Sequence, residues 1–453
     1  MRRLIFGAGL STVLALAAAC TSQAPSTQAP ASAAPGAVQA AKDAAAKAAD
    51  GKQLGGTLNL LGLLSGEQLN QYLSTFKPFE DATGTTIKYE TTADLPAVLQ
   101  TRIAAGRAPD LVSDPSAGQL RQLATEGRLV PIGDWLDQAA LRKDFPAGLI
   151  DLASTGGKLY GLFYNASVQN LIWYDPKTYD GPKPPADWAD LQRWTSAQAS
   201  SGATPWCLGV ESGAASGWLG AAMIEQFVLR QSGTGPYDDW WQGKLRWTSP
   251  QVKAAFTAFG QISTDPKQVA GGPTAVLTTS FSTSPQGLYA KPPRCKLTPQ
   301  AEWLGNTLAQ TVPDVKAVDD IDFFTFPALD AANGGLLETS GEMLGAFKDS
   351  PQTRAFMRYL ATPQFATLVG STGQWLPANR GVSAEQIPSA LSKKAAQAYA
   401  KASDVRYAAQ SAMPPAMQSA FFKAVLDYVK TPSSLDQILV NLDEQQRAAY
   451  KPA

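Results

Sequence analysis

Small polar and carboxylate residues stand at the ends of two expected β-strands in the N-terminal part of the chain. Ser65, Gly66 and Glu67 follow the apolar run at 57–63, and Asp114 closes a later strand. In α/β sheets, ligand sites lie outside the carboxyl ends of the strands. Carboxylates placed there accept hydrogen bonds from ligand hydroxyl groups. Glu67 and Asp114 also suit the start of a helix, as a dipole partner and a cap, and the pattern does not separate the two roles.

A second group of candidates combines a carboxylate with aromatic rings. Glu211 and Trp218 flank a polar, glycine-containing loop ahead of a helix, a setting that favours contact with a ligand. Ser280 and Phe281 end a segment of apolar and threonine residues, and Trp173 lies in the apolar run at 171–173. Aromatic faces cover the apolar faces of sugar rings, but they also fill protein cores. Core packing is therefore the rival interpretation for Phe281 and Trp173.

The composition excludes several kinds of chemistry. The chain contains no histidine, which removes Ser-His-Asp and Cys-His catalysis and the commonest zinc ligand. Lys+Arg and Asp+Glu both number 38, so no net charge favours binding to nucleic acid. A hydrolase would have to use a carboxylate pair drawn from Glu67, Asp114, Glu211 and Glu342. We expect no cofactor and no metal.

The elements that must position these residues alternate between strand and helix. Apolar runs at 57–63, 85–90 and 109–114 predict strands, and the residues between them show helical periodicity. Such alternation predicts an α/β fold with a mainly parallel sheet. The length of 453 residues indicates two domains.

The N-terminus reads as an export signal. Arg2 and Arg3 precede an apolar stretch and small residues that lead into Cys20, the pattern of a bacterial lipoprotein signal over residues 1–19. Ordinary cleavage beside a chance cysteine is the alternative. Residues 20–56 are rich in Ala, Pro, Ser and Gln and almost lack large apolar side chains, which predicts a flexible tether. A lipid anchor at Cys20 would hold the protein at the membrane without a spanning helix.

Cys207 and Cys295 are the two cysteines that remain after Cys20. In an exported chain, two such cysteines are expected to pair as a disulfide. Two free buried thiols are the alternative.

Several segments, in the same order along the chain, resemble the extracellular solute-binding proteins of carbohydrate ABC importers. They are TLNLLGLLSGEQLNQYLSTFKPFEDATGTTIKYE, GRAPDLVSDPSAGQLRQLATEGRLVPIGDWLD and GGKLYGLFYNASVQNLIWYDPKTYD. Phe163 stands where that family usually has proline. The segments TPWCLGVESGAASGWLGAAMIEQFVLR, TTSFSTSPQGLYAKPPRCKLTPQAEW and DIDFFTFP resemble the α-glucoside-binding branch, whose cysteine pair corresponds to Cys207 and Cys295. Glu342 stands where that branch commonly has aspartate.

The resemblance implies two α/β lobes with a hinge and a ligand cleft between them. The implied boundaries are 57–165 and 328–375 for lobe 1, and 166–327 and 376–453 for lobe 2, with crossings near Ala166, Pro327 and Trp375. It adds Tyr164, Gly341, Glu342 and Trp375 to the candidate ligand-binding residues. It further implies an α-glucoside of the maltose, trehalose or sucrose class as ligand, a monomer, permease subunits as partners, and a place on the outer face of the bacterial cell membrane.

Three other functions compete with this interpretation. A lipid-anchored glycosidase would use the carboxylate pair described above. A binder of a phosphorylated or amino solute would need a cationic cluster or a glycine-rich helix entry, whereas these candidates are acidic and aromatic. A structural lipoprotein would bind no ligand.

Overall fold

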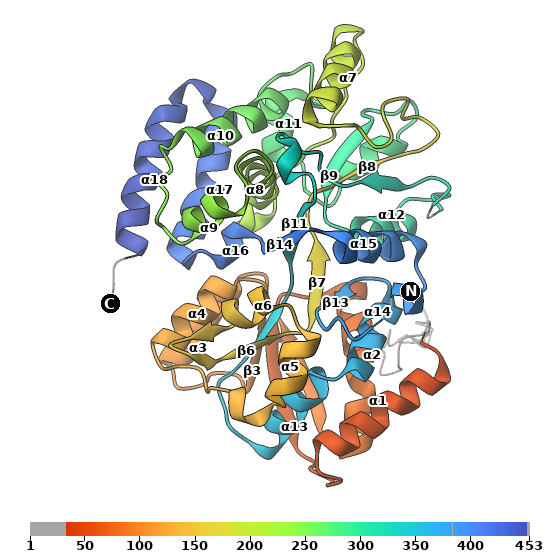
Figure 1. The fold of residues 1–453 in the computed structure, drawn as a ribbon, viewed down its shortest axis with the longest axis vertical. Helices are drawn as coiled ribbons and strands as arrows, with labels where there is room; N and C mark the ends of the chain where they lie inside the picture. The colour runs from red at the N-terminus through yellow and green to blue at the C-terminus, as the bar shows by residue number, and fades with distance from the viewer. Residues whose placement is uncertain (1–32, 317, 383, 451–453) are drawn as a thin grey trace, which may run out of the picture.

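The chain forms two α/β lobes, one above the other in Figure 1, joined by a small sheet of crossing strands. The computed structural model describes residues 33–316, 318–382 and 384–450. The expected signal sequence, with Cys20, therefore lies outside the described residues. Within the described ranges, no helix is both long enough and apolar enough to span a membrane.

A five-stranded sheet forms the centre of the lower lobe. Its order is β2 (Thr86–Thr91), β1 (Thr57–Gly62), β3 (Leu111–Asp114), β12 (Met343–Ala346) and β6 (Gly161–Phe163). The first three strands are parallel, and β12 runs antiparallel to both of its neighbours. Leu58 and Leu60 alternate with exposed residues along β1 and point into the core, as period-two patterning requires.

Helices cover both faces of this sheet. They are α2 (Gly66–Thr83), α3 (Leu95–Ala104), α4 (Ala117–Thr125), α5 (Gln138–Asp144), α6 (Ala147–Leu152), α13 (Pro351–Leu360) and α14 (Pro363–Thr372). A two-stranded ribbon, β4 (Ser154–Thr155) with β5 (Lys158–Leu159), borders α6. The strands predicted from the apolar runs are therefore present as β1, β2 and β3, within one or two residues of their expected ends.

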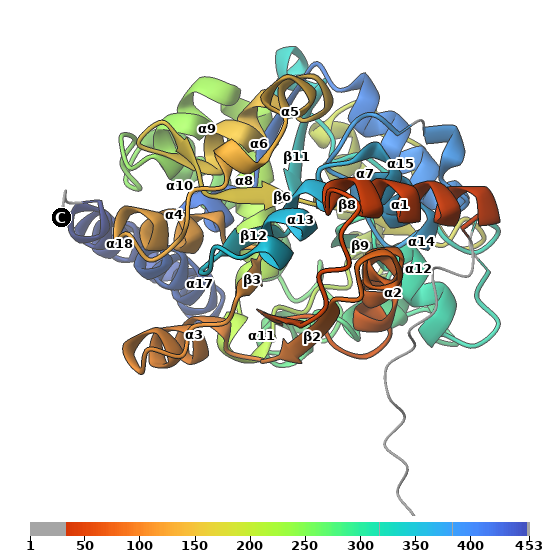
Figure 2. The same ribbon diagram turned by 90° about the horizontal axis from the view of Figure 1, so that it is seen from below.

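The flexible tether expected over residues 20–56 is wrong for residues 35–48, and its first part, residues 20–32, lies outside the described residues. Residues Pro35–Ala48 form helix α1, which packs against α2, α13 and α14 on the outside of the lower lobe (Figure 2). Ala41 and Ala45 are wholly buried in that contact. Small side chains that recur on one face allow a helix to dock closely without large apolar residues, so the composition of this segment was misleading. Proline at the first helical position and a run of alanines favour the helix itself.

The upper lobe is mostly helical around a three-stranded antiparallel sheet. The sheet order is β10 (Asp322–Phe324), β8 (Leu171–Tyr174) and β9 (Leu297–Gln300). The helices are α7 (Trp188–Ser200), α8 (Trp218–Ser232), α9 (Thr234–Trp241), α10 (Pro250–Ser263), α11 (Gly272–Thr278), α12 (Leu304–Thr311), α15 (Ala390–Lys401), α16 (Ala409–Ala412), α17 (Pro415–Lys430) and α18 (Leu435–Ala449). Helix α8 is buried on nearly every side, with α10, α17 and α9 packed around it.

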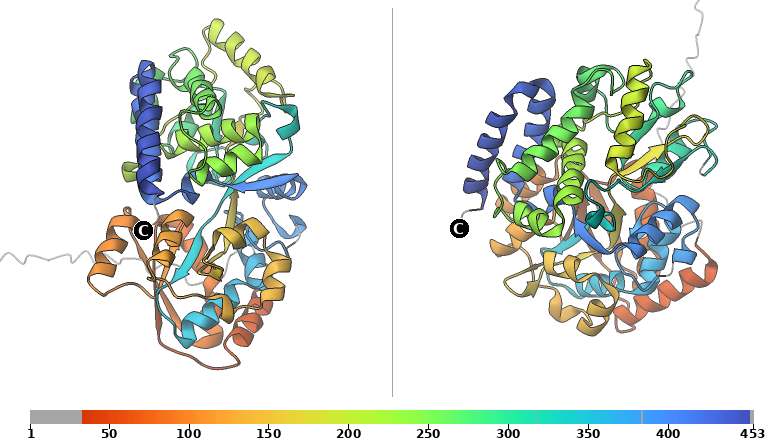
Figure 3. Two further views of the ribbon diagram at one scale, coloured as in Figure 1. Left: turned by 60° about the vertical axis from the view of Figure 1, so that its left-hand side comes forward. Right: turned by 45° about the horizontal axis from the view of Figure 1, so that its top comes forward.

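Crossing strands between the lobes form a third sheet (Figure 3). Its order is β13 (Leu376–Pro377), β7 (Asn165–Val168), β11 (Leu336–Ser340) and β14 (Asp404–Tyr407). The second crossing differs from the one expected near Pro327. The Asp330 N–H donates to the Arg230 carbonyl in α8 at 3.1 Å, which keeps the preceding segment on the upper lobe. The chain therefore changes lobes along β11, beyond residue 336.

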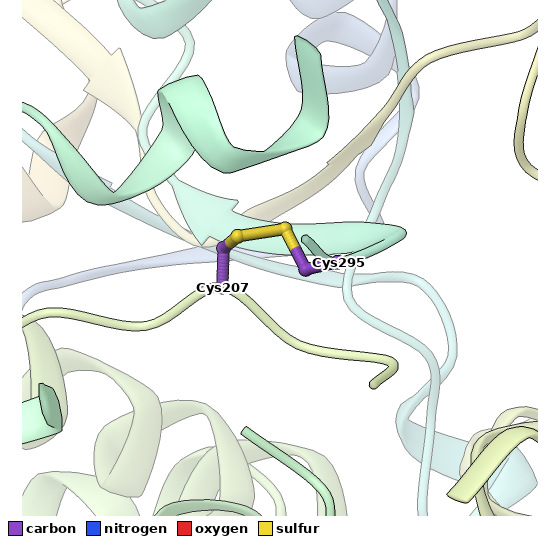
Figure 4. Close-up of a disulfide and its surroundings, with 2 residues drawn as sticks. All are labelled: Cys207 and Cys295. Atoms are coloured by element: carbon purple, nitrogen blue, oxygen red, sulfur yellow. A yellow bond between two sulfur atoms is a disulfide. The ribbon is translucent and has the colours of Figure 1, made fainter. Parts of the chain in front are cut away.

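Cys207 and Cys295 form a disulfide inside the upper lobe (Figure 4), as predicted from export. The bond joins the segment before α8 to the start of β9 across 88 residues of sequence. Both cysteines are buried, together with Leu288.

Two glutamates form a buried acid pair behind the crossing sheet. Glu338 lies in β11 and Glu225 in α8, and neither is exposed. Tyr237 Oη donates to Glu338 Oε2 at 3.2 Å, and the Gln410 N–H donates to Glu225 Oε1. The Glu338 carboxylate is close enough to disfavour a second charge on Glu225, so a proton on one of the two carboxyl groups is favoured. Burial raises the pKa of both groups.

We expect removal of the disulfide to destabilise the upper lobe. A loop of 88 residues corresponds to a loss of about 4–5 kcal/mol in unfolding free energy in the chain-entropy model. Denaturant unfolding of the Cys207→Ala/Cys295→Ala variant measures this loss. A reductant should lower the stability of the wild type toward that of the variant and leave the variant unchanged. Equal unfolding free energies of the variant and the wild type without reductant would show that the disulfide contributes nothing to stability.

We expect the acid pair to make stability fall at alkaline pH. A carboxyl group whose folded pKa is raised contributes stability that is fully present below the unfolded pKa and is lost as pH rises through the folded pKa. In Glu225→Gln, the amide donates to Glu338 without a shared proton, so the unfolding temperature should fall less between pH 6 and pH 9. At the alkaline end, the unfolding temperature of the variant should exceed that of the wild type by about 2–4 °C for each kcal/mol of unfolding free energy that the substitution restores. Identical pH profiles for the variant and the wild type would contradict this assignment.

Candidate ligand-binding site

A hydrogen-bonded carboxylate lies at the edge of the lower sheet that faces the crossing strands. Glu342 precedes β12, and the register of Met343 with Asp114 places it beside the end of β3. Tyr164 Oη donates to Glu342 Oε2 at 2.6 Å, and Ser113 Oγ donates to the same oxygen. Within the described residues, Glu342 Oε1 has no hydrogen-bond partner, and the side chain is partly accessible. That oxygen is therefore available as an acceptor.

Asp114 is the second carboxyl group at this edge, and it is almost fully buried. Its Oδ1 accepts from the Ser116 N–H at 2.7 Å, whereas no described residue bonds to Oδ2. Burial, and next the nearby Glu342 carboxylate, raise the pKa of Asp114 to about 7. Burial also raises the pKa of Glu342, against the lowering effect of the Ser113 and Tyr164 hydroxyls. Hydrogen bonds between polar groups, not a neighbouring cation, hold Glu342 in place.

The Ser65–Glu67 segment starts α2 directly after β1. Ser65 is the N-cap of the helix, but its side chain makes no capping bond, and Gly66 has a φ of 56°. The exposed Glu67 carboxylate accepts from Gln71 Nε2 at 2.7 Å and from Asn70 Nδ2 at 3.3 Å in its own helix. Ser65 and Gly66 thus have uncommitted groups, whereas Glu67 is partly committed to α2.

On the upper lobe, three half-buried aromatic rings form a continuous row. The ring centroids of Trp218 and Phe281 are 5.3 Å apart, and those of Phe281 and Trp303 are 6.2 Å apart. Glu211 and Ser280 pair as a β-bridge beside this row, and Glu211 Oε1 accepts from the Gly213 N–H at 2.9 Å. The structure therefore brings together four of the five residues predicted in this lobe, and leaves Trp173 apart. It adds Trp303, whose contact with Phe281 was not predicted because the two residues lie far apart in the sequence.

Strand β7 is hydrogen-bonded to residues next to both groups. The Asn165 side chain accepts from the Glu342 N–H at 2.7 Å, and the Ser167 hydroxyl donates to Glu302, which precedes Trp303. Residues 165 and 167 point to the same face of the strand, because side chains alternate along it. Hydrogen bonds from this face of β7 therefore reach the Glu342 backbone and the side chain of Glu302, the residue before Trp303. Sequence reasoning missed Asn165, Ser167 and Glu302, although the alternation of polar residues from 165 to 169 carries a signal.

The structure corrects the roles expected of two tryptophans. Trp173 is fully buried in β8, its Nε1 donates to the Gln300 carbonyl at 3.0 Å, and its ring packs against Phe323. It is a core residue and does not reach a ligand. Trp375 is 7% exposed and lies edge-on to Tyr72, with ring centroids 6.3 Å apart, so it packs in the core of the lower lobe. Gly341 is also buried: a Cβ there would lie 2.4 Å from the Asn165 carbonyl oxygen.

A cavity of about 1660 Å³ lies elsewhere between the lobes. Arg121, Trp241, Thr339 and Tyr399 line it, and none of the candidate residues does. Thr339 and Ser340 are neighbours in β11 and so point to opposite faces, and Ser340 Oγ accepts from Gln169 on the candidate side. The cavity therefore lies on the other face of the crossing sheet. We favour the first face because the carboxyl ends of β1 and β3 and the unpaired carboxylate oxygens lie there.

Comparisons with known proteins agree with this architecture. The model of the family "bacterial extracellular solute-binding protein" matches residues 63–367. The osmoprotective compounds-binding protein GgtB of Synechocystis is 31% identical over 82% of this chain and 88% of its own. The alpha-glucosides-binding periplasmic protein AglE of Rhizobium meliloti is 30% identical over 84% of this chain and 85% of its own.

Solved structures show the same fold. The bacterial solute receptor AcbH, described as preferring β-D-galactopyranose, superposes with a TM-score of 0.74 at 18% identity, over 87% of this chain and 100% of its own. A chitin oligosaccharide binding protein gives a TM-score of 0.72 at 19% identity, over 87% and 98%. The chain therefore belongs to the bacterial extracellular solute-binding proteins, an extracytoplasmic family that binds solutes, sugars among them, for ABC importers and carries out no catalysis.

Proposed function

We propose that this protein captures a compact, neutral α-glucoside between its lobes and delivers it unaltered to an ABC permease. The observation that carries the proposal is that β7 hydrogen-bonds both to Glu342, whose carboxylate is partly accessible, and to Glu302, the neighbour of Trp303 in the Trp218–Phe281–Trp303 row. Sugar hydroxyls donate to carboxylate oxygens, and aromatic faces cover the C–H surfaces of pyranose rings. The two groups supply both kinds of contact from opposite lobes.

The choice of ligand class rests on charge and on the relatives. The candidate groups are carboxylates, hydroxyls and rings, a set that disfavours phosphate or carboxylate ligands. AglE is described as binding alpha-glucosides, and GgtB as binding osmoprotective compounds. A disaccharide such as maltose, trehalose or sucrose satisfies the first description. A different small osmoprotective solute is the second candidate, supported by the similarity to GgtB.

We further propose that the lobes move about the crossing strands. The lower lobe would comprise residues 33–165 and 341–375, and the upper lobe 166–340 and 376–450. Closure around the ligand is a hinge motion, in which short segments absorb the backbone change. A lipid anchor at Cys20 would keep the protein beside its permease, and α1, docked on the lower lobe, would move the start of the folded part to Pro35.

We expect Trp218→Ala to weaken sugar binding by about 1–3 kcal/mol, because the truncated ring no longer covers a pyranose face. Trp241→Ala is the matched control, since Trp241 is also half-buried but lines the cavity on the other face. Titration calorimetry with glucose, maltose, trehalose, sucrose and maltodextrins measures both variants. A loss of affinity in Trp241→Ala alone would move the site to the cavity. If the wild type bound none of these sugars, the α-glucoside proposal would fail.

Glu342→Gln should weaken binding of the same sugar by about 10-fold or more, because hydrogen bonds to a charged acceptor contribute about 1.5–3 kcal/mol. Glu67→Gln should have a smaller effect, because that carboxylate already accepts two bonds within α2. Calorimetry at one pH, with thermal unfolding in parallel, separates binding from folding. An unchanged dissociation constant in Glu342→Gln would remove this residue from the site.

A further inference from the structure

The Leu64 peptide is held on both sides by side chains of β2. Its N–H donates to Tyr89 Oη at 3.0 Å, and its carbonyl accepts from Thr91 Oγ1 at 2.8 Å. Leu64 directly precedes the Ser65–Glu67 segment that starts α2. Because Ser65 makes no side-chain capping bond, the neighbouring strand, not the helix cap, fixes where this segment begins.

Gly62 provides the space that the Tyr89 hydroxyl occupies. A Cβ at position 62 would lie 2.1 Å from Tyr89 Oη and 2.8 Å from Cζ of the same ring. No real Cβ approaches another heavy atom that closely, so any larger residue would push the tyrosine away. The requirement is steric, because φ at Gly62 is not positive.

The same tyrosine leads toward Glu342. The Tyr89 ring lies edge-on to Tyr72 with centroids 5.9 Å apart, and Tyr72 packs against Tyr164 at 4.8 Å. Tyr164 in turn donates to Glu342. Burial, and next the Glu342 carboxylate, raise the pKa of Tyr89, so the phenol stays protonated at physiological pH. Packed aromatic rings thus join the end of β1 to the carboxylate beside β12.

We propose that Tyr89 is a positioning residue for ligand binding, which holds the Ser65–Glu67 segment at a fixed place relative to Glu342 through the Leu64 N–H. The inference rests on the proposed function, since it assumes that the ligand lies at this edge of the sheet. Tyr89 acts through Leu64 and needs no ligand contact of its own. Gly62 leaves room for the Tyr89 hydroxyl, and Thr91 holds the carbonyl of the same Leu64 peptide.

Tyr89→Phe keeps the ring and removes only the hydroxyl. We expect it to weaken binding of maltose, trehalose or sucrose, whichever the wild type binds, by about 3- to 10-fold, the range for one hydrogen bond. Tyr359→Phe is the matched control, because Tyr359 Oη donates to the Thr75 carbonyl at 3.0 Å in the core of the same lobe. That variant should lose thermal stability but retain the wild-type affinity.

Two further variants test the mechanism itself. Gly62→Ala should weaken binding as Tyr89→Phe does, because both changes break the contact between Tyr89 and the Leu64 N–H. The double variant should therefore have the same affinity as whichever single variant binds more weakly. Thr91 is exposed at the end of its strand, so Thr91→Val should fold normally. It therefore tests the same mechanism if Gly62→Ala does not fold. It should produce a smaller loss of affinity than Tyr89→Phe.

The outcomes separate the two proposals. Failure of the wild type to bind any of the three sugars overturns the proposed function. Tight binding by the wild type together with unchanged affinity in Tyr89→Phe overturns only the role of Tyr89. Equal losses of affinity in Tyr89→Phe and Tyr359→Phe would also overturn it, because general destabilisation of the lobe would then explain both.

Discussion

Carboxyl groups buried near the crossing strands are the constraint on which the rest of this structure depends. Glu342 is held by Ser113 and Tyr164, Glu302 by Ser167, and Glu338 by Tyr237. A buried charge without partners is costly, so each carboxyl must find hydrogen bonds or keep a proton. Because hydroxyls rather than cations satisfy Glu342, its remaining oxygen can accept a bond from a neutral ligand without first breaking an ion pair.

The crossing sheet has two faces with different surroundings. On one face, Asn165 bonds to the Glu342 backbone and Ser167 bonds to Glu302, the residue before Trp303. On the other, Thr339 lines the cavity of about 1660 Å³. The lobes therefore offer two chemically different sites on opposite faces of the same crossing strands.

The sequence supported much of the fold, because strand and helix periodicities in the lower lobe are local signals. The runs at 57–63 and 109–114 are β1 and β3 in the structure. The pairing of Cys207 with Cys295 was predicted because exported proteins tend to form disulfides. The stable docking of helix α1 was not predicted, because alanines that bury one face of a helix give the segment the composition of a linker without large apolar residues. The crossing at β11 was placed too early, because the contact between Asp330 and α8 joins residues far apart in the chain.

The candidate site was less predictable, because it depends on which side of a strand or helix a residue faces. The sequence left Trp173 open between a ligand contact and core packing, and its complete burial in β8 decides for the core, whereas Trp218 begins a helix beside Phe281. Trp303 and Tyr89 carry no motif and become relevant only through contacts made by the fold.

The most direct test of the account is a crystal structure of the protein with a bound disaccharide. The account predicts ligand hydroxyls on Glu342 Oε1 and a pyranose face against the Trp218–Phe281–Trp303 row, with the carbohydrate intact. Ligand density on the opposite face of the crossing sheet, beside Trp241 and Tyr399, would contradict it.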